Sequence, residues 1–363
     1  GPVPMPWLDG APPLVPMTMY FEDGTAFDGD PRHALENTLK RYAEHGWSVV
    51  AATELEFTLV DDTSEVLAPV KDPQTGRPLE TPDILSVAQL DAFDDFLNAL
   101  YDGCAAMGIA AQTATCEAGI GQFEVTLHHQ EALRAADDTW LFKALIRGLA
   151  RKHGCAATFM AKPFADDAGN GMHLHFSVLD EAGQNIFDNG GDEGSDILRS
   201  AVAGCLSAMP DSTLIFAPHA GSYARLIPGA HAPTGAGWAY ENRTAALRIP
   251  GGPAEARRIE HRVAGGDINP YLIFAAILGA ALLGIEEDMT PPAPITGNAY
   301  DHDLPQMAAD WSSAINQFEA SSLMRRILPQ DLIDNLVMTK RQELRLLAEK
   351  PEDTHWQVYL ETV

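Results

Sequence analysis

The stretch from Ala51 to Val60 limits the possible folds more than any other part of the chain. It reads A-A-T-E-L-E-F-T-L-V, which is typical of a buried β-strand, and Glu54 and Glu56 are its only strongly polar residues. Side chains alternate along a strand, so the two glutamates point to the same face. Buried carboxylates are costly unless they are paired or bound to metal. We therefore expect both carboxylates to project into one cavity that pairs them or holds a cation.

Two further motifs contain side chains that suit the same site. His173 and His175 alternate in G-N-G-M-H-L-H-F-S, and Glu117 and Glu124 bracket E-A-G-I-G-Q-F-E. Carboxylate oxygens with one or two imidazoles suit Mg²⁺ or Mn²⁺, whereas zinc favours more nitrogen or sulfur. A metal site rich in carboxylates usually handles phosphate. Each motif alone is also compatible with a solvated strand edge, but their conjunction favours a metal site.

Charge and cysteine usage exclude several classes of protein. The chain has 363 residues, of which 51 are acidic and 24 basic, giving a net charge of −27. This balance argues against nucleic-acid binding, which needs a basic surface. It suits solubility or a salty habitat better than the attraction of cationic small molecules. The four cysteines have no C-x-x-C spacing and indicate reduced, buried thiols in a cytoplasmic protein.

Alternating strand-like and helix-like segments predict an α+β fold built on an antiparallel sheet. Asp30 and Pro31 open a helix that stops at Gly46, and Ser86 caps a single helix that extends to about Met107. The apolar run 270–285 is too short to span a bilayer and predicts a core helix, so no membrane partner is expected. Other expected segments are strands at 109–116, 122–128, 157–164 and 172–179, helices at 130–152, 195–208, 269–286 and 332–349, and a Gly/Pro-rich stretch at 217–238.

The motifs, taken in order, resemble the glutamine synthetase superfamily from about Trp7 to the C-terminus. They are E-L-E, E-A-G-I-G-Q-F-E, G-N-G-M-H-L-H-F-S, R-L-I-P-G, N-R-T-A-A-L-R-I-P and R-R-I-E-H-R-V. Their variants are most similar to the γ-glutamyl-amine ligase branch, such as the γ-glutamylpolyamine synthetases. The resemblance implies a catalytic domain over 31–363, with an antiparallel sheet forming the active-site funnel and helices packed outside. Residues 1–30 are then expected to be a linker and strands from the end of an N-terminal β-grasp domain that this chain lacks.

The resemblance also implies a reaction and its partners. ATP phosphorylates the γ-carboxylate of L-glutamate, an amine or ammonia then displaces the phosphate, and two or three Mg²⁺ or Mn²⁺ ions assist. The enzyme is expected in the cytoplasm as a ring-shaped homo-oligomer, a dodecamer in the intact protein. An ammonia-using glutamine synthetase is one alternative, and a catalytically silent regulatory or structural relative is another. The silent alternative is disfavoured because all six metal-ligand positions retain residues able to bind metal.

The resemblance assigns roles residue by residue. Six residues match metal ligands, the first three at the ion that holds glutamate and the γ-phosphate and the others at the ion between the ATP phosphates: Glu56, Glu117, Glu124, Glu54, His173 and Glu260. Three match groups beside the ATP phosphates: His175, Arg248 and Arg258. Three match glutamate binders, the first through its backbone: Gly169, Arg225 and Arg262. Arg243 matches a catalytic arginine that takes up phosphate charge.

The arginines also support this assignment on physical grounds. Six of the 24 basic residues lie between Arg225 and Arg262, and such a concentration in an acidic chain is not expected of a solvated face. Guanidinium groups suit carboxylate and phosphate better than lysine does. Arg257 is the one most easily interpreted as a surface ion pair.

Two positions depart from the family pattern. The loop before Met172 reads Ala-Gly-Asn-Gly instead of Asn-Gly-Ser-Gly, which puts its side-chain contacts to glutamate in doubt. His231 stands where the family often has a glutamate that closes the active-site flap and helps deprotonate ammonium. A neutral imidazole binds a cation poorly but can accept a proton from an amine. We therefore predict a catalytic role for His231 and a preference for an amine over ammonia.

Overall fold

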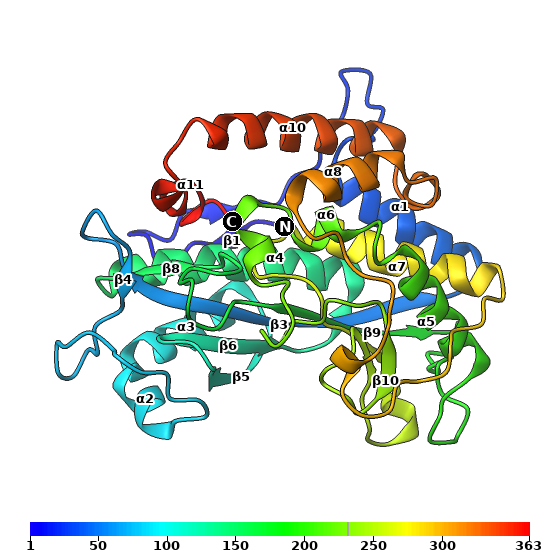
Figure 1. The fold of residues 1–363 in the computed structure, drawn as a ribbon, viewed down its shortest axis with the longest axis horizontal. Coiled ribbons are helices and arrows are strands. Elements are labelled where there is room, and N and C mark those ends of the chain that lie inside the picture. The colour runs from blue at the N-terminus through cyan, green and yellow to red at the C-terminus, as the bar shows by residue number, and fades with distance from the viewer. Residues whose placement is uncertain (231) are drawn as a thin grey trace.

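A large β-sheet organises the computed structural model, which describes residues 1–230 and 232–363 (Figure 1). Its main strands lie in the order β10 (Trp238–Tyr240), β11 (Leu247–Ile249), β12 (Ile259–His261), β9 (Met172–Leu179), β3 (Ser48–Asp61), β6 (Gln122–Leu127) and β5 (Ala111–Cys116). Three short strands also pair with β3: β4 (Ala68–Pro69), β7 (Gln130–Glu131) and β8 (Ala156–Thr158). The predicted α+β class is confirmed.

The predicted antiparallel sheet is confirmed except at one edge, where one pair of strands is parallel. All pairs are antiparallel except β10 and β11, which run parallel with Trp238 opposite Leu247. Only the residues between Tyr240 and Leu247 join these two strands, so the chain must turn back twice within this short segment. Glu241 begins the segment with a positive φ of 51°, a conformation that allows a tight turn.

Strand β3 has the alternation that the sequence predicts. Leu55 and Phe57 are fully buried, whereas Glu54 and Glu56 lie on the other face and are partly exposed. Thr53, on the buried side, contacts Thr139 of α4 (Ala132–Lys152) with 3.0 Å between their hydroxyl oxygens. The glutamates therefore point away from the helix that covers the sheet.

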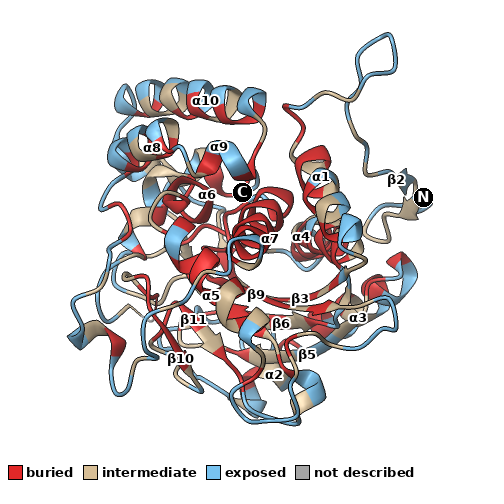
Figure 2. Cartoon of the chain, turned by 90° about the vertical axis from the view of Figure 1, so that its right-hand side faces the viewer, coloured by how far each residue is buried: buried red, intermediate tan, exposed pale blue. Residues whose placement is uncertain are grey.

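A layer of helices buries the apolar face of the sheet (Figure 2). Its centre is α7 (Pro270–Glu286), which is buried from Pro270 to Gly284 and packs against α1 (Pro31–Glu44), α4 and α5 (Asp196–Ala208). Gly204 of α5 meets α7 so closely that an added Cβ would lie 2.1 Å from the carbonyl oxygen of Ala280. The predicted core helix is confirmed, and no helix among the described residues is long and apolar enough to cross a membrane.

One predicted helix is interrupted, and one predicted strand ends earlier than expected. The helix from Ser86 is broken at Phe93 into α2 (Val87–Ala92) and α3 (Asp94–Met107), because Phe93 packs against Phe123 and leaves helical geometry. The strand predicted over 157–164 stops at Thr158, whose hydroxyl accepts the amide of Met160.

The remaining elements lie before α1 and in the second half of the chain. Near the N-terminus β1 (Val3–Pro4) pairs with β2 (Pro13–Leu14), and a hairpin turns at Gly24. The other helices are α6 (Thr213–Phe216), α8 (Trp311–Ala320), α9 (Met324–Ile327), α10 (Gln330–Ala348) and α11 (Trp356–Tyr359), with the 3₁₀ helices η1 (Ala220–Ala224), η2 (Ala254–Ala256), η3 (Ala299–Asp301) and η4 (Glu352–Thr354).

Candidate active site

Neighbouring strands present the predicted site residues in a row across the sheet. The residues that lie opposite one another are Arg248 and Glu260 (β11 and β12), Glu260 and His175 (β12 and β9), His173 and Glu54 (β9 and β3), and Glu56 and Glu124 (β3 and β6). Directly opposed side chains of an antiparallel pair have Cβ atoms roughly 5 Å apart. The strand register thus brings together groups that are more than 200 residues apart in the sequence.

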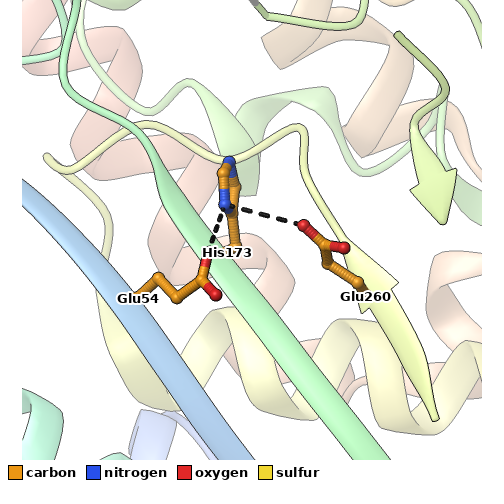
Figure 3. Close-up of side chains that lie close together, drawn as sticks. All are labelled: Glu54, His173 and Glu260. Atoms are coloured by element: carbon orange, nitrogen blue, oxygen red, sulfur yellow. Dashed lines mark hydrogen bonds and ion pairs between the residues drawn. The ribbon is translucent and has the colours of Figure 1, made fainter. Parts of the chain in front are cut away.

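Glu54, His173 and Glu260 form the tightest cluster (Figure 3). Nδ1 of His173 lies 2.9 Å from Oε2 of Glu54 and 3.8 Å from Oε1 of Glu260. One ligand atom from each residue lies within 4.8 Å of the others. Burial acts to raise the pKa of Glu54, but its hydrogen bond to His173 and the close imidazole of His175 lower it. Glu54 therefore stays anionic, as a cation ligand must.

Arginines surround this cluster on the β11 and β12 side. Glu260 is 1% exposed and accepts from Nη1 of Arg248 at 2.8 Å, and it also pairs with Arg262. Burial acts to raise the pKa of Glu260, but Arg262 and the neighbouring histidines and Arg248 lower it. Arg258 donates from Nε to Nδ1 of His175 at 3.3 Å. The arrangement places fixed positive charge beside the predicted metal ligands.

A cavity of about 590 Å³ opens beside Glu54. His175 and Arg258, both predicted to contact ATP phosphates, lie in its wall, and His128 and His129 lie there as well. Its volume is within the range of small-molecule sites. A second cavity of about 470 Å³ lies on the helical side of the sheet and contains none of the predicted site residues.

Glu56, Glu117 and Glu124 form a second, more open acidic group. Burial and the charges of Glu56 and Glu54 raise the pKa of Glu117 to about 7. Burial and the charges of Glu54, Glu56 and Glu117 raise the pKa of Glu124 to about 9. Within the described part of the chain only the first cluster has ligand atoms within 4.8 Å of one another, so these three do not converge as closely. Mutual repulsion of carboxylates accounts for both observations.

These residues fit a site for hard divalent cations. Their donors are carboxylate oxygens and imidazole nitrogens, the set that Mg²⁺ and Mn²⁺ accept. Nε2 of His175 is buried and has no hydrogen bond to residues 1–230 or 232–363, although Oε1 of Glu54 lies 3.0 Å away. A cation would also remove the repulsion that raises the pKa of Glu124.

The loop before β9 joins this site to Arg225. Arg225 is 4% exposed and donates from Nη1 to the carbonyl of Val263 at 2.8 Å. A Cβ on Gly171 would lie 2.5 Å from Nη2 of Arg225 and 3.2 Å from Oε2 of Glu56. A Cβ on Gly169 would lie 2.4 Å from the carbonyl oxygen of Ala161 and 3.1 Å from Cγ of Arg225. Both glycines are therefore needed for the close approach of this loop to the arginine.

Sequence reasoning did not reveal what the polar side chains of this loop do. Asn170 is fully buried and points inward, donating to Met160 O at 2.9 Å and accepting from Gln122 at 2.9 Å. Gln122 also donates to the carbonyl of Gly169 at 2.9 Å. The Asn170 side chain therefore braces the loop, which agrees with the doubt about its contact with glutamate. The sequence shows only that Asn170 lies between two glycines and that Gln122 begins a predicted strand.

The last predicted residues have mixed outcomes. Arg243 lies near enough to Glu117 to oppose the rise of its pKa. Arg257 is not a surface ion pair: it is 4% exposed and donates to Gly191 O at 3.2 Å, so that interpretation is wrong. His231 lies outside the described residues.

Comparison with known proteins agrees with this geometry. The family described as "Glutamine synthetase, catalytic domain" matches residues 28–359. γ-Glutamylputrescine synthetase PuuA of Escherichia coli is 37% identical over 92% of this chain and 72% of its own length. γ-Glutamylethanolamide synthetase GlnA4 of Streptomyces coelicolor is 33% identical over 94% and 73%. The solved GmaS/ADP complex superposes with a TM-score of 0.82 and 27% identity, covering 95% of this chain and 80% of that one.

Proposed function

This chain belongs to the glutamine synthetase family, and we propose that it joins the γ-carboxylate of L-glutamate to a primary amine at the expense of ATP. The observation that carries the proposal is the row of carboxylates, histidines and arginines on one face of the sheet. Family membership makes the chain an ATP-dependent carbon–nitrogen ligase. The amine is the part of the proposal that distinguishes it from a glutamine synthetase.

Two chemical steps follow from this assignment. An oxygen of the γ-carboxylate attacks the γ-phosphorus of ATP, the bond to the ADP oxygen breaks, and a γ-glutamyl phosphate forms. The amine nitrogen then attacks the acyl carbon, phosphate leaves with that carboxylate oxygen, and the amine loses a proton. Each step develops charge on phosphate oxygens, so positioning and electrostatics provide most of the catalysis.

The roles of individual residues are part of the proposal. Arg225 and Arg262 orient the glutamate, and buried guanidinium groups suit this because they bind carboxylates in a bidentate manner. His175, Arg248 and Arg258 face the nucleotide phosphates, and Arg243 takes up charge as phosphate leaves. Glu54, His173 and Glu260, together with the second acidic group, would hold two or three Mg²⁺ or Mn²⁺ ions. Bound ions neutralise the phosphate oxygens and polarise the phosphorus.

Two observations support an amine over ammonia. The two relatives described above are named for putrescine and ethanolamine, both primary amines. His231 stands where the family often has the glutamate that binds ammonium, and a neutral imidazole binds a cation poorly.

Two broader features also belong to the proposal. We propose a ring-type homo-oligomer, which light scattering would measure. We also propose that the reaction takes place in the cytoplasm, since the four cysteines are free and ATP is available there.

The experiment compares nucleophiles in separate reactions. The protein is incubated with ATP, Mg²⁺ and glutamate, together with ammonia, ethanolamine, putrescine or isopropylamine in turn. ADP release and product mass are measured. We expect the highest kcat/KM with an amine and a product equal to glutamate plus amine minus water. A highest kcat/KM with ammonia would instead identify a glutamine synthetase, and no ADP release with any nucleophile would identify a silent relative.

A further inference from the structure

Glu241 has a backbone conformation that a glutamate rarely adopts. It follows β10 with a φ of 51°, in the left-handed region that costs a non-glycine residue roughly 1 kcal/mol or more. Its side chain is 57% exposed, so burial of apolar atoms does not repay this strain. Such a conformation persists only where other contacts require it, and the contacts of the carboxylate identify that requirement.

Both carboxylate oxygens of Glu241 have a partner across the turn. Oε1 accepts the backbone N–H of Gly251, and Oε2 accepts from Nη2 of Arg248 at 3.2 Å. The backbone N–H of Glu241 donates to Ile249 O at 3.1 Å. The left-handed turn thus allows one residue to bind the end of β11, the following Pro-Gly-Gly loop and an arginine of the site.

The loop that Glu241 anchors leads directly to the nucleotide side of the site. It runs from Pro250 through Gly252, whose φ is 111°, to Arg258, which donates to His175 in the wall of the large cavity. Two adjacent glycines give this loop little stiffness of its own. Loss of the bond to Gly251 would therefore loosen the segment that places Arg258.

The bond to Arg248 has a second consequence, because Arg248 is shared. Its Nη1 donates to Oε2 of Glu260 at 2.8 Å, while Nη2 donates to Glu241. Glu260 is also paired with Arg262. A second carboxylate that binds Arg248 reduces the extent to which the two arginines neutralise Glu260, and it would keep the guanidinium beside Glu260 if Glu260 held a cation.

We propose that Glu241 is a positioning residue that holds Arg248 and the loop from Pro250 to Arg258 in the geometry that binds the ATP phosphates. The inference rests on the proposed function, since it takes the ligand at this place to be Mg·ATP. It adds to that function a residue that touches neither glutamate nor the reacting atoms.

Three variants separate positioning from folding. Glu241→Gly relieves the left-handed strain but removes both bonds of the carboxylate. Glu241→Gln keeps an oxygen for the amide of Gly251 but loses the charge that binds Arg248. Asp288→Gly is the matched control: Asp288 has a φ of 49° in an exposed position after α7, and its side chain makes no hydrogen bond to any residue in 1–230 or 232–363.

The measurements are the affinity for AMP-PNP with Mg²⁺ by calorimetry, KM for ATP and for glutamate, kcat, and Tm. Glu241→Gly should keep the wild-type Tm, yet bind AMP-PNP about tenfold more weakly and raise KM for ATP by a similar factor, as expected for a lost charged hydrogen bond. KM for glutamate should stay within about twofold, because the residues that orient glutamate are unchanged. Glu241→Gln should fall between wild type and Glu241→Gly, and Asp288→Gly should match wild type in binding and kinetics.

Two results would overturn the inference. One is wild-type AMP-PNP affinity and KM for ATP in Glu241→Gly. The other is an equal loss in Tm and in both KM values, which would indicate a general structural role. A wild-type protein that makes no amide would instead overturn the proposed function, and calorimetry would still decide whether Glu241 affects nucleotide binding.

Discussion

Replacement of Glu124 with glutamine tests whether the second acidic group is a set of repelling carboxylates. Burial and the charges of Glu54, Glu56 and Glu117 raise the pKa of Glu124 to about 9. Glutamine has the shape of the protonated acid but has no proton to lose, so it stays neutral as the pH rises. The metal-free Glu124→Gln protein should therefore be more stable than wild type at pH values above 4.5, where the carboxyl group of unfolded wild type ionises.

The sign of the effect follows from proton linkage. A carboxyl group with a raised pKa binds more protons in the folded state, so its stabilisation is present below its unfolded pKa of 4.5 and is lost as pH rises through about 9. The full shift corresponds to ~6 kcal/mol at 1.36 kcal/mol per pKa unit. Glu124 is only half-buried, so water and salt screen part of this effect and we expect ~2–3 kcal/mol of that amount.

The assay is urea unfolding in EDTA at pH 5 and pH 9. The free energy of unfolding of wild type should fall, relative to that of Glu124→Gln, by ~2–3 kcal/mol between the two pH values. Glu65→Gln is the matched control, because Glu65 is exposed in the loop after β3 and should leave the wild-type profile unchanged. Parallel pH profiles for wild type and Glu124→Gln would refute the reasoning.

Three further predictions concern metal, glutamate and the nucleophile. Mg²⁺ or Mn²⁺ should raise the Tm of wild type by mass action, and Glu124→Ala and Glu260→Ala should each lose most of that rise in thermal scans, so an equal rise in both would contradict the metal site. Gly171→Ala should raise KM for glutamate about tenfold and leave KM for ATP unchanged in steady-state assays. The added methyl would lie 2.5 Å from Nη2 of Arg225 and so displaces that arginine. An unchanged KM for glutamate would contradict this. His231→Glu should raise kcat/KM for ammonia relative to that for an amine. An unchanged ratio of the two kcat/KM values would show that His231 does not determine the choice of nucleophile.

The carboxylate and histidine pairs could be predicted from the sequence because alternation along a strand is local. Glu54 with Glu56, and His173 with His175, each follow from the period of two. Their pairing across strands depends on register, which the sequence does not state. The family resemblance grouped Glu54 with His173 and Glu260 around one ion but gave no register, and the structure places Glu54 opposite His173.

Features that depend on distant contacts could not be predicted. The break at Phe93 arises from packing on Phe123, which belongs to another strand. Arg257 can be buried because the backbone oxygens of Gly191 and Pro250 accept its hydrogen bonds. Neither oxygen belongs to the predicted strand that contains Arg257. The turn at Glu241 gave no signal at all, because glutamate is not a residue that indicates a left-handed conformation.

Buried polar groups were missed for the same reason. Lys143 lies in an amphipathic helix and gives no sign of burial, yet it is 5% exposed and donates to Gly266 O at 2.8 Å and Ile268 O at 3.1 Å. Burial lowers its pKa to about 7. Lysine is seldom fully buried, so only the tertiary structure could reveal that it braces the segment after β12.

The most direct test of the central claim follows one oxygen atom through the reaction. L-Glutamate labelled with ¹⁸O in its γ-carboxylate is incubated with ATP, Mg²⁺ and the best amine, and the phosphate released is examined by ³¹P NMR. A γ-glutamyl phosphate intermediate predicts one ¹⁸O in each phosphate and one amide for each ADP. Unlabelled phosphate, or ADP formed without amide, would contradict the account.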